Sequence, residues 1–153
     1  MTQTDKRHVL AEISTKDRLH TTLPLAISAV AQQTRKPDRL LIFNDGQPED
    51  LEGDPLFHNL FAMLDQCAID WDLRAGRQKG QHLNHQQALE EADDLIWRLD
   101  DDEVPRPDTL QRLLTHMAPQ GGGRRRKPRI IAPQLSQTIK EITSTFSFTH
   151  TPQ

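Results

Sequence analysis

Short apolar runs alternate with amphipathic segments of helical length along most of this chain. The apolar runs predict strands at residues 8–14, 39–43, 68–73 and 95–99, and the segments between them predict helices at 19–33, 56–67 and 85–92. Regular alternation of strands and helices is typical of an α/β fold. We therefore expect a Rossmann-like, mainly parallel sheet flanked by helices.

Polar loops follow three of the predicted strands, at residues 14–18, 44–46 and 100–102. Open parallel sheets bind ligands at the carboxyl ends of their strands, so the three loops predict one pocket for a charged ligand such as a nucleotide. In that pocket Asp45 would accept a hydrogen bond from a base or a ribose hydroxyl. Ordinary loop polarity explains each segment equally well when it is taken singly.

Three consecutive carboxylates, Asp100, Asp101 and Asp102, end the last apolar run. Crowded carboxylates repel one another unless water or a cation screens them, and hard cations such as Mg²⁺ or Mn²⁺ prefer oxygen ligands. The triplet therefore predicts a metal site. The alternative is a solvated acidic turn, because Pro105 and Pro107 follow closely.

In their order, several of these segments resemble the N-terminal part of a family 2 glycosyltransferase of GT-A fold. The resemblance covers about residues 8–116, and its motifs are STKDR at 14–18, IFNDG at 42–46, Gly80 to Asn84, and LDDD at 99–102. It implies a metal-dependent, inverting transfer of a sugar from a nucleotide-sugar donor, by default a UDP-sugar, to an acceptor hydroxyl. The implied donor-binding residues are Ser14, Thr15, Asp17, Arg18, Asp45, Gly80, Asn84, Asp100 and Asp101, with Asp102 and Asp100 holding Mn²⁺ or Mg²⁺.

Two positions depart from the common pattern of that family. Lys16 stands where an aromatic residue often stacks on the base, and a lysine there could instead reach a phosphate. Leu83 stands where many members carry an arginine that neutralises the diphosphate. Charge compensation could come from Arg74, Arg77 and Lys79, although a solvated basic loop explains at least two of these residues better.

Within the acidic triplet, Asp101→Asn is expected to matter less than changes at Asp100 or Asp102. Strand alternation should point the Asp101 side chain away from the site.

Two histidines and two tryptophans have simpler explanations than a functional site. His82 and His85 are three residues apart, but no strong zinc spacing accompanies them and Cys67 is the only cysteine, so a polar helix start is the better interpretation. Trp71 and Trp97 lie in strand-like runs, where burial of large aromatic side chains is expected.

Composition fits one compact domain, because the 153 residues are 35% apolar and 27% charged. A single cysteine excludes an intramolecular disulfide and suits a reducing compartment. The charged first twenty residues do not make a secretory signal, and the longest apolar stretch, 23–31, is shorter than the ~20 residues of a membrane span. We expect a cytoplasmic protein without a transmembrane segment.

Charge divides the chain at about residue 117. Residues 1–116 hold 13 Lys and Arg against 21 Asp and Glu, whereas residues 117–153 hold 6 against 1. The segment after GGG at 121–123 is RRRKPR, followed by a Ser/Thr-rich end. We expect a nucleotide-sugar-binding domain over 1–117 and a poorly ordered tail over 118–153, with nucleic-acid binding by the basic run less favoured.

No catalytic base can be named from this sequence. Inverting transfer needs a base that deprotonates the acceptor hydroxyl, and after Asp108 the only carboxylate side chain is Glu141. Together with the resemblance, the missing base implies an incomplete GT-A fold, truncated or altered after about residue 117. A non-catalytic nucleotide-binding module that lacks the acceptor half is the alternative function, and the acceptor itself stays unknown.

Overall fold

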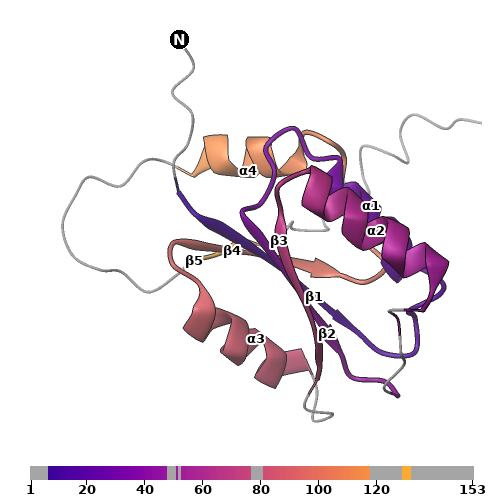
Figure 1. The fold of residues 1–153 in the computed structure, drawn as a ribbon. Helices are drawn as coiled ribbons and strands as arrows, with labels where there is room; N and C mark the ends of the chain where they lie inside the picture. Colours follow the sequence, from indigo (N-terminus) through magenta and orange to yellow (C-terminus); the bar gives the residue numbers. More distant parts are fainter. Residues whose placement is uncertain (1–6, 48–50, 52, 77–80, 118–128, 132–153) are drawn as a thin grey trace, which may run out of the picture.

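The computed structural model describes residues 7–47, 51, 53–76, 81–117 and 129–131 (Figure 1). Five strands and four helices lie in these ranges. In chain order they are β1 (Val9–Thr15), α1 (Leu23–Ala31), β2 (Arg39–Asn44), α2 (Pro55–Gln66), β3 (Asp70–Ala75), α3 (Gln81–Glu91), β4 (Leu95–Asp100), α4 (Thr109–His116) and β5 (Arg129–Ile131). The α/β class predicted from the alternating pattern is confirmed.

The strands form one parallel sheet in the order β3-β2-β1-β4-β5, so β1 is central. Thr15 pairs with Asn44 of β2, and Ser14 pairs with Asp100 of β4. Because these strands end at the same level, the loops that follow β1, β2 and β4 meet at one edge of the sheet. The sheet register therefore brings together the three polar loops singled out in the sequence.

Helices cover both faces of the sheet (Figure 1). Alternate residues of β1, such as Ala11 and Ile13, pack with α1, α2 and α4 in the larger apolar core. A smaller core on the opposite face joins Leu10 and Phe43 to Ala88 of α3. Trp97 is fully buried in the larger core, as its strand-like setting predicts.

Trp71 is half-buried at the edge of the larger core, and its ring stacks on that of Phe61 with ring centroids 3.9 Å apart. Both tryptophans thus pack against the core, as predicted. None of the helices described here combines the length and the apolar character that crossing a membrane requires.

Element boundaries differ from the sequence expectation in several places: β3 begins and ends two residues later than expected, and α4 was not predicted. Helix α1 begins only at Leu23, because Pro24 suits a first helical turn and the preceding residues form turns. Helix α3 begins at Gln81 rather than 85. The sequence did not predict its first turn, because that turn is polar and shows little apolar periodicity. Strand β5 lies inside the predicted tail and pairs with β4. The sequence did not predict it, because three residues are too short to show an alternation of apolar and polar positions.

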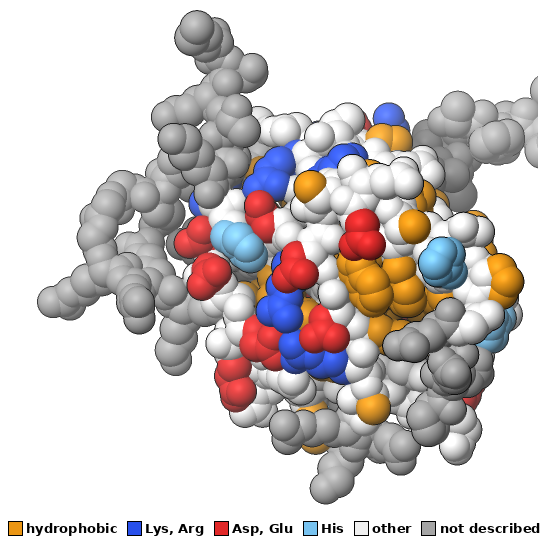
Figure 2. All heavy atoms as spheres, in the orientation of Figure 1, with side chains coloured by type: hydrophobic (Ala, Val, Ile, Leu, Met, Phe, Trp, Pro, Cys, Tyr) orange, Lys and Arg blue, Asp and Glu red, His pale blue; other side chains and the backbone are white. Residues whose placement is uncertain are grey.

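An ion-pair network lies where β3 and β2 meet the end of α3, and acidic and basic side chains alternate on this side of the molecule (Figure 2). Arg74 donates to Asp72 at 2.6 Å and to both oxygens of Glu91, which also pairs with Arg39 at 3.1 Å. The Arg74 guanidinium therefore links β3 to the end of α3. These ion pairs favour a structural role for Arg74 over compensation of a diphosphate.

Glu91→Gln is expected to lower the free energy of unfolding by about 1 kcal/mol at neutral pH. The hydrogen bond from Arg74 lowers the pKa of Glu91 below its ordinary value of 4.5. Stability from this carboxylate is therefore fully present above 4.5 and is lost as pH falls through the lowered pKa. Urea unfolding of both proteins at several pH values checks this, and a difference that persists unchanged in acid would contradict it.

Candidate functional site

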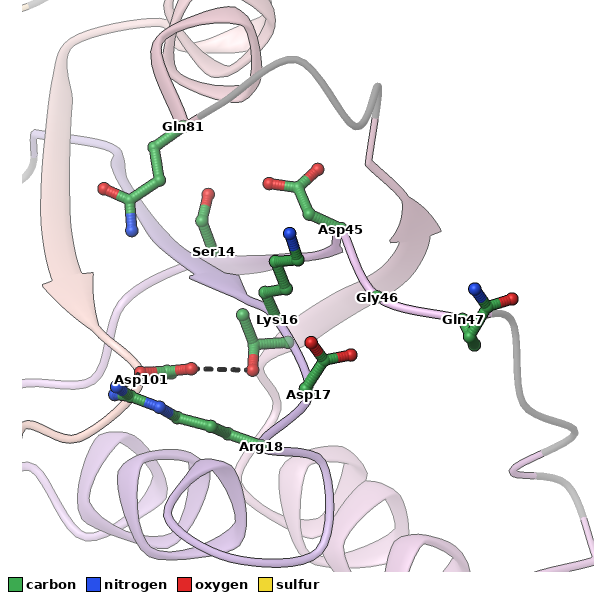
Figure 3. A pocket seen from close by; sticks show the side chains of 10 residues that line it. Ser14, Lys16, Asp17, Arg18, Asp45, Gly46, Gln47, Gln81 and Asp101 are labelled. Carbon is green, nitrogen blue, oxygen red and sulfur yellow. Dashed lines mark hydrogen bonds and ion pairs between the residues drawn. The ribbon is translucent and has the colours of Figure 1, made fainter.

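A cavity of about 620 Å³ opens at the carboxyl edge of the sheet, beside the ends of β1 and β2 and the start of α3. Its lining mixes carboxylates, two cationic side chains, hydroxyls and amides (Figure 3). The lining residues are Ser14, Thr15, Lys16, Asp17, Arg18, Asp45, Gly46, Gln47, Gln81 and Asp101. Convergent polar groups of both signs suit a ligand that carries hydrogen-bonding and charged parts together.

The loops after β1 and β2 touch directly beside this cavity. Asp17 has a φ of 58°, a left-handed conformation that aspartate tolerates better than most residues. A Cβ on Gly46 would lie 2.9 Å from Asp17 Oδ1 and 3.1 Å from Asp17 N. Glycine at 46 therefore lets the two loops approach each other closely.

Asp45 is fixed from three directions. Its backbone N–H donates to Thr15 O at 2.8 Å, which extends the β1–β2 ladder into the loop. Its Oδ2 accepts a hydrogen bond of 2.9 Å from Asn84 Nδ2 of α3. A Cβ on Gly76, just after β3, would lie 1.7 Å from Asp45 Oδ1, so only glycine leaves room for the carboxylate there.

Asp101 joins the β4 turn to the β1 loop. Its Oδ2 accepts from Thr15 Oγ1 at 2.8 Å, and its Oδ1 accepts from Arg18 Nη1 at 2.9 Å. Arg18 also reaches Asp102 Oδ2 at 3.2 Å, and the charges of Asp101 and then Asp102 raise its pKa. The expectation that Asp101 alternates away is therefore wrong, because this side chain lines the cavity and holds two other lining residues.

Asp100 and Asp102 are exposed residues at the end of β4 and in the turn that follows, outside the cavity lining. Glu103, a residue that sequence reasoning passed over, accepts from Asp100 N at 3.2 Å. Burial raises the pKa of Glu103, and the charges of Asp100 and Asp102 raise it further. Within the described ranges no group of three or more His, Cys, Asp or Glu side chains is placed to hold a metal ion.

The residues that the sequence analysis singled out separate into four groups. The cavity brings together Ser14, Thr15, Asp17, Arg18, Asp45 and Asp101. Asn84 is buried and donates to two lining residues, Ser14 and Asp45, while Asp100 and Asp102 are exposed and outside the lining. Gly80, Arg77 and Lys79 lie outside the described residues.

Lys16 is a lining residue whose side chain extends toward Ser14 and Asp45 (Figure 3). Gln47 and Gln81 also line the cavity, although nothing in the sequence marked them beyond their closeness to the predicted motifs. The two histidines of α3 differ. His82 is exposed, whereas His85 faces the buried Glu12 of β1 with Nδ1 2.5 Å from Oε1, so His85 does more than start a polar helix.

Comparison with known proteins bears on the fold alone. No family model matches this sequence, and no curated protein matches it. Among solved structures, the chain resembles the crystal structure of S. aureus TarS, a family 2 glycosyltransferase, with a TM-score of 0.51 and 14% sequence identity. The match covers 69% of this chain and 18% of the TarS chain. The chain therefore shares a Rossmann-like α/β fold with part of TarS.

Proposed function

We propose that the cavity binds the nucleoside diphosphate part of a nucleotide-sugar donor for glycosyl transfer to an acceptor hydroxyl. The observation that carries this proposal is the fixed carboxylate of Asp45 in a polar cavity at the carboxyl edge of a glycosyltransferase-like sheet. Ligands of open parallel sheets bind at this edge. The match spans only 18% of the TarS chain. The proposal therefore names neither the acceptor nor the catalytic base.

The lining offers separate contacts for the two halves of such a donor. Asp45 is positioned to accept hydrogen bonds from a base or a ribose hydroxyl. Lys16 and Arg18, the cationic residues among the described part of the lining, suit the phosphates. A UDP-sugar is the default donor, because none of the described lining residues argues for another base.

Asp100 and Asp102 are the proposed ligands of a divalent cation. Mg²⁺ sites commonly use one or two carboxylates together with substrate phosphates and water, so an acidic rim beside the cavity fits such an ion without a complete protein cage. Burial is the main cause of the raised pKa of Glu103, and the charges of Asp100 and Asp102 add to it, so a cation beside them would relieve that part of the rise. When bound there, the cation would neutralise charge on the departing diphosphate.

Asp45→Asn is expected to weaken UDP binding by about 1–3 kcal/mol, the range for a lost hydrogen bond to a charged acceptor. Isothermal titration calorimetry in Mn²⁺ measures the effect. Asp93→Asn is the matched control, because Asp93 is an exposed residue just before the opposite end of β4. Equal UDP affinity of Asp45→Asn and the parent would contradict nucleoside recognition by Asp45, and a parent chain that binds no nucleoside diphosphate would contradict the proposed function.

A further inference from the structure

A carboxylate, Glu12, is buried in the middle of the central strand. Its side chain is 0% exposed and lies on the sheet face that α3 covers. Burying a charge is strongly unfavourable unless the charge is paired, and an apolar residue of similar volume is often at least as stabilising. Core stability alone therefore does not explain a glutamate at this position.

Nitrogen-bearing side chains from two other elements pack around Glu12. His85 of α3 places Nδ1 2.5 and 2.7 Å from the two carboxylate oxygens, and Arg98, opposite Glu12 in the β4 register, contacts His85 Nε2. On the other side, β2 contributes the apolar Leu41. Burial raises the pKa of Glu12, while the hydrogen bond from His85 and the charges of His85 and Arg98 oppose that rise.

A continuous hydrogen-bond chain leads from Glu12 to the cavity. Ser14 Oγ donates to Glu12 Oε1 at 3.3 Å and accepts from Asn84 Nδ2 at 3.2 Å. The same Asn84 nitrogen donates to Asp45 Oδ2 at 2.9 Å. Two intermediate side chains, Ser14 and Asn84, thus separate the buried pair from the carboxylate at the cavity.

The carboxylates at the two ends, Glu12 and Asp45, together set the direction of the donors between them. An ionised carboxylate only accepts, so the single hydroxyl hydrogen of Ser14 points to Glu12 and its lone pairs face Asn84. Asn84 must then present its NH₂ group, which also serves Asp45. Its Oδ1 is buried without a hydrogen-bond partner in the described part of the chain, as expected when the donors set the amide orientation.

Loss of the charge on Glu12 would remove one of the two carboxylates that orient the chain. Ser14 could then turn its hydrogen away from Glu12 and toward the NH₂ group of Asn84. That clash would shift Asn84 relative to the Asp45 carboxylate that it holds.

We propose that Glu12 and His85 are positioning residues for Asp45, acting through Ser14 and Asn84, and that they set affinity for the nucleoside rather than for the diphosphate. This inference rests on the proposed function, because it takes Asp45 as the nucleoside acceptor. Neither Glu12 nor His85 lines the cavity, so direct contact with the ligand does not account for the expected effect.

The test is Glu12→Gln, which keeps the side-chain shape and removes the charge. UDP binding in Mn²⁺ is expected to weaken about tenfold, while binding of inorganic pyrophosphate changes less than about twofold. In an Asp45→Asn background the same change is expected to add less than about twofold, because interacting residues give non-additive effects. A merely structural role would weaken both ligands and would add to Asp45→Asn.

Glu91→Gln is the matched control. It makes the same isosteric change on the same face of the sheet, at the other end of α3, and breaks a network with Arg74 and Arg39 that does not reach the cavity. UDP affinity is expected to stay unchanged in this variant. If Glu12→Gln fails to fold by circular dichroism, His85→Gln removes the imidazole that contacts both Glu12 oxygens and should reproduce the selective loss of UDP affinity.

A ligand-free measurement separates this inference from the proposed function. The side-chain amide signals of Asn84 in ¹⁵N spectra, assigned with Asn84→Ala, are expected to shift in Glu12→Gln and not in Glu91→Gln. If the parent chain binds UDP and Glu12→Gln binds it equally well, the inference is overturned. If the parent binds no nucleoside diphosphate, the proposed function fails. The Asn84 signals then test the link between Glu12 and Asn84 by themselves, and an unshifted amide in Glu12→Gln overturns the inference.

Discussion

Removal of divalent cations is expected to weaken UDP binding at least about tenfold, equivalent to ~1.4 kcal/mol. The diphosphate would otherwise approach the exposed carboxylates of Asp100 and Asp102 without a bridging charge. Asp102→Ala is expected to remove most of the difference between Mn²⁺ and chelator, because it removes a proposed ligand. Calorimetric titration of UDP into each protein, in Mn²⁺ and in chelator, measures both effects.

Asp108→Ala is a suitable control for that experiment. Asp108 lies in the same acidic stretch at the start of α4, where its side chain makes no capping hydrogen bond. Its removal is expected to leave the metal dependence intact. Equal affinity of the parent chain for UDP in Mn²⁺ and in chelator would count against a metal at the rim and would leave Lys16 and Arg18 as the proposed phosphate contacts.

Gly76→Ala is expected to weaken UDP binding by about 2–3 kcal/mol, the upper part of the range for a hydrogen bond to a charged group. The new Cβ would lie 1.7 Å from Asp45 Oδ1 and 2.6 Å from Asp45 Cγ, so the carboxylate has to move. The movement also breaks its contact with Asn84. The expected loss is therefore at least as large as that of Asp45→Asn, although Gly76→Ala does not alter the Asp45 side chain itself.

Gly53→Ala provides a matched comparison, because a Cβ at Gly53 meets nothing within 4 Å. UDP affinity is expected to stay within about twofold of the parent in that variant, which removes no ligand contact. Thermal unfolding of both variants separates a local displacement of Asp45 from a general loss of stability. A Gly76→Ala chain that binds UDP as tightly as Gly53→Ala would show that the position of Asp45 does not control binding.

The sequence pattern was sufficient to predict the α/β class and the edge of the sheet where the cavity lies. Strands buried on both faces appear as continuous apolar runs, such as RLLIF at 39–43, and helices show an apolar stripe, so both signals are local. Parallel strands must also end at a common edge. The polar residues after β1, β2 and β4 therefore had to meet, and Asp45 was identified for that reason.

Which of those polar side chains face the cavity depended on the tertiary structure. Asp101 joins Thr15 and Arg18 across sequence separations of 86 and 83 residues, which only the β1–β4 register brings within reach. A turn at the end of β4, and not strand alternation, sets the direction of this side chain. The sequence expectation for Asp101 failed at that step.

The pairing of Glu12 with His85 was likewise beyond local pattern, because 73 residues separate the two. Within its own segment Glu12 resembles a polar residue on the exposed side of a strand, and His85 resembles a polar residue at a helix start. Burial became necessary only once α3 packed on that face of the sheet, and burial is what makes a carboxylate require a partner. Local periodicity thus determined the fold and the edge that holds the site, whereas strand register and helix packing decided which charged side chains meet, since electrostatic pairing depends on distance in space rather than along the chain.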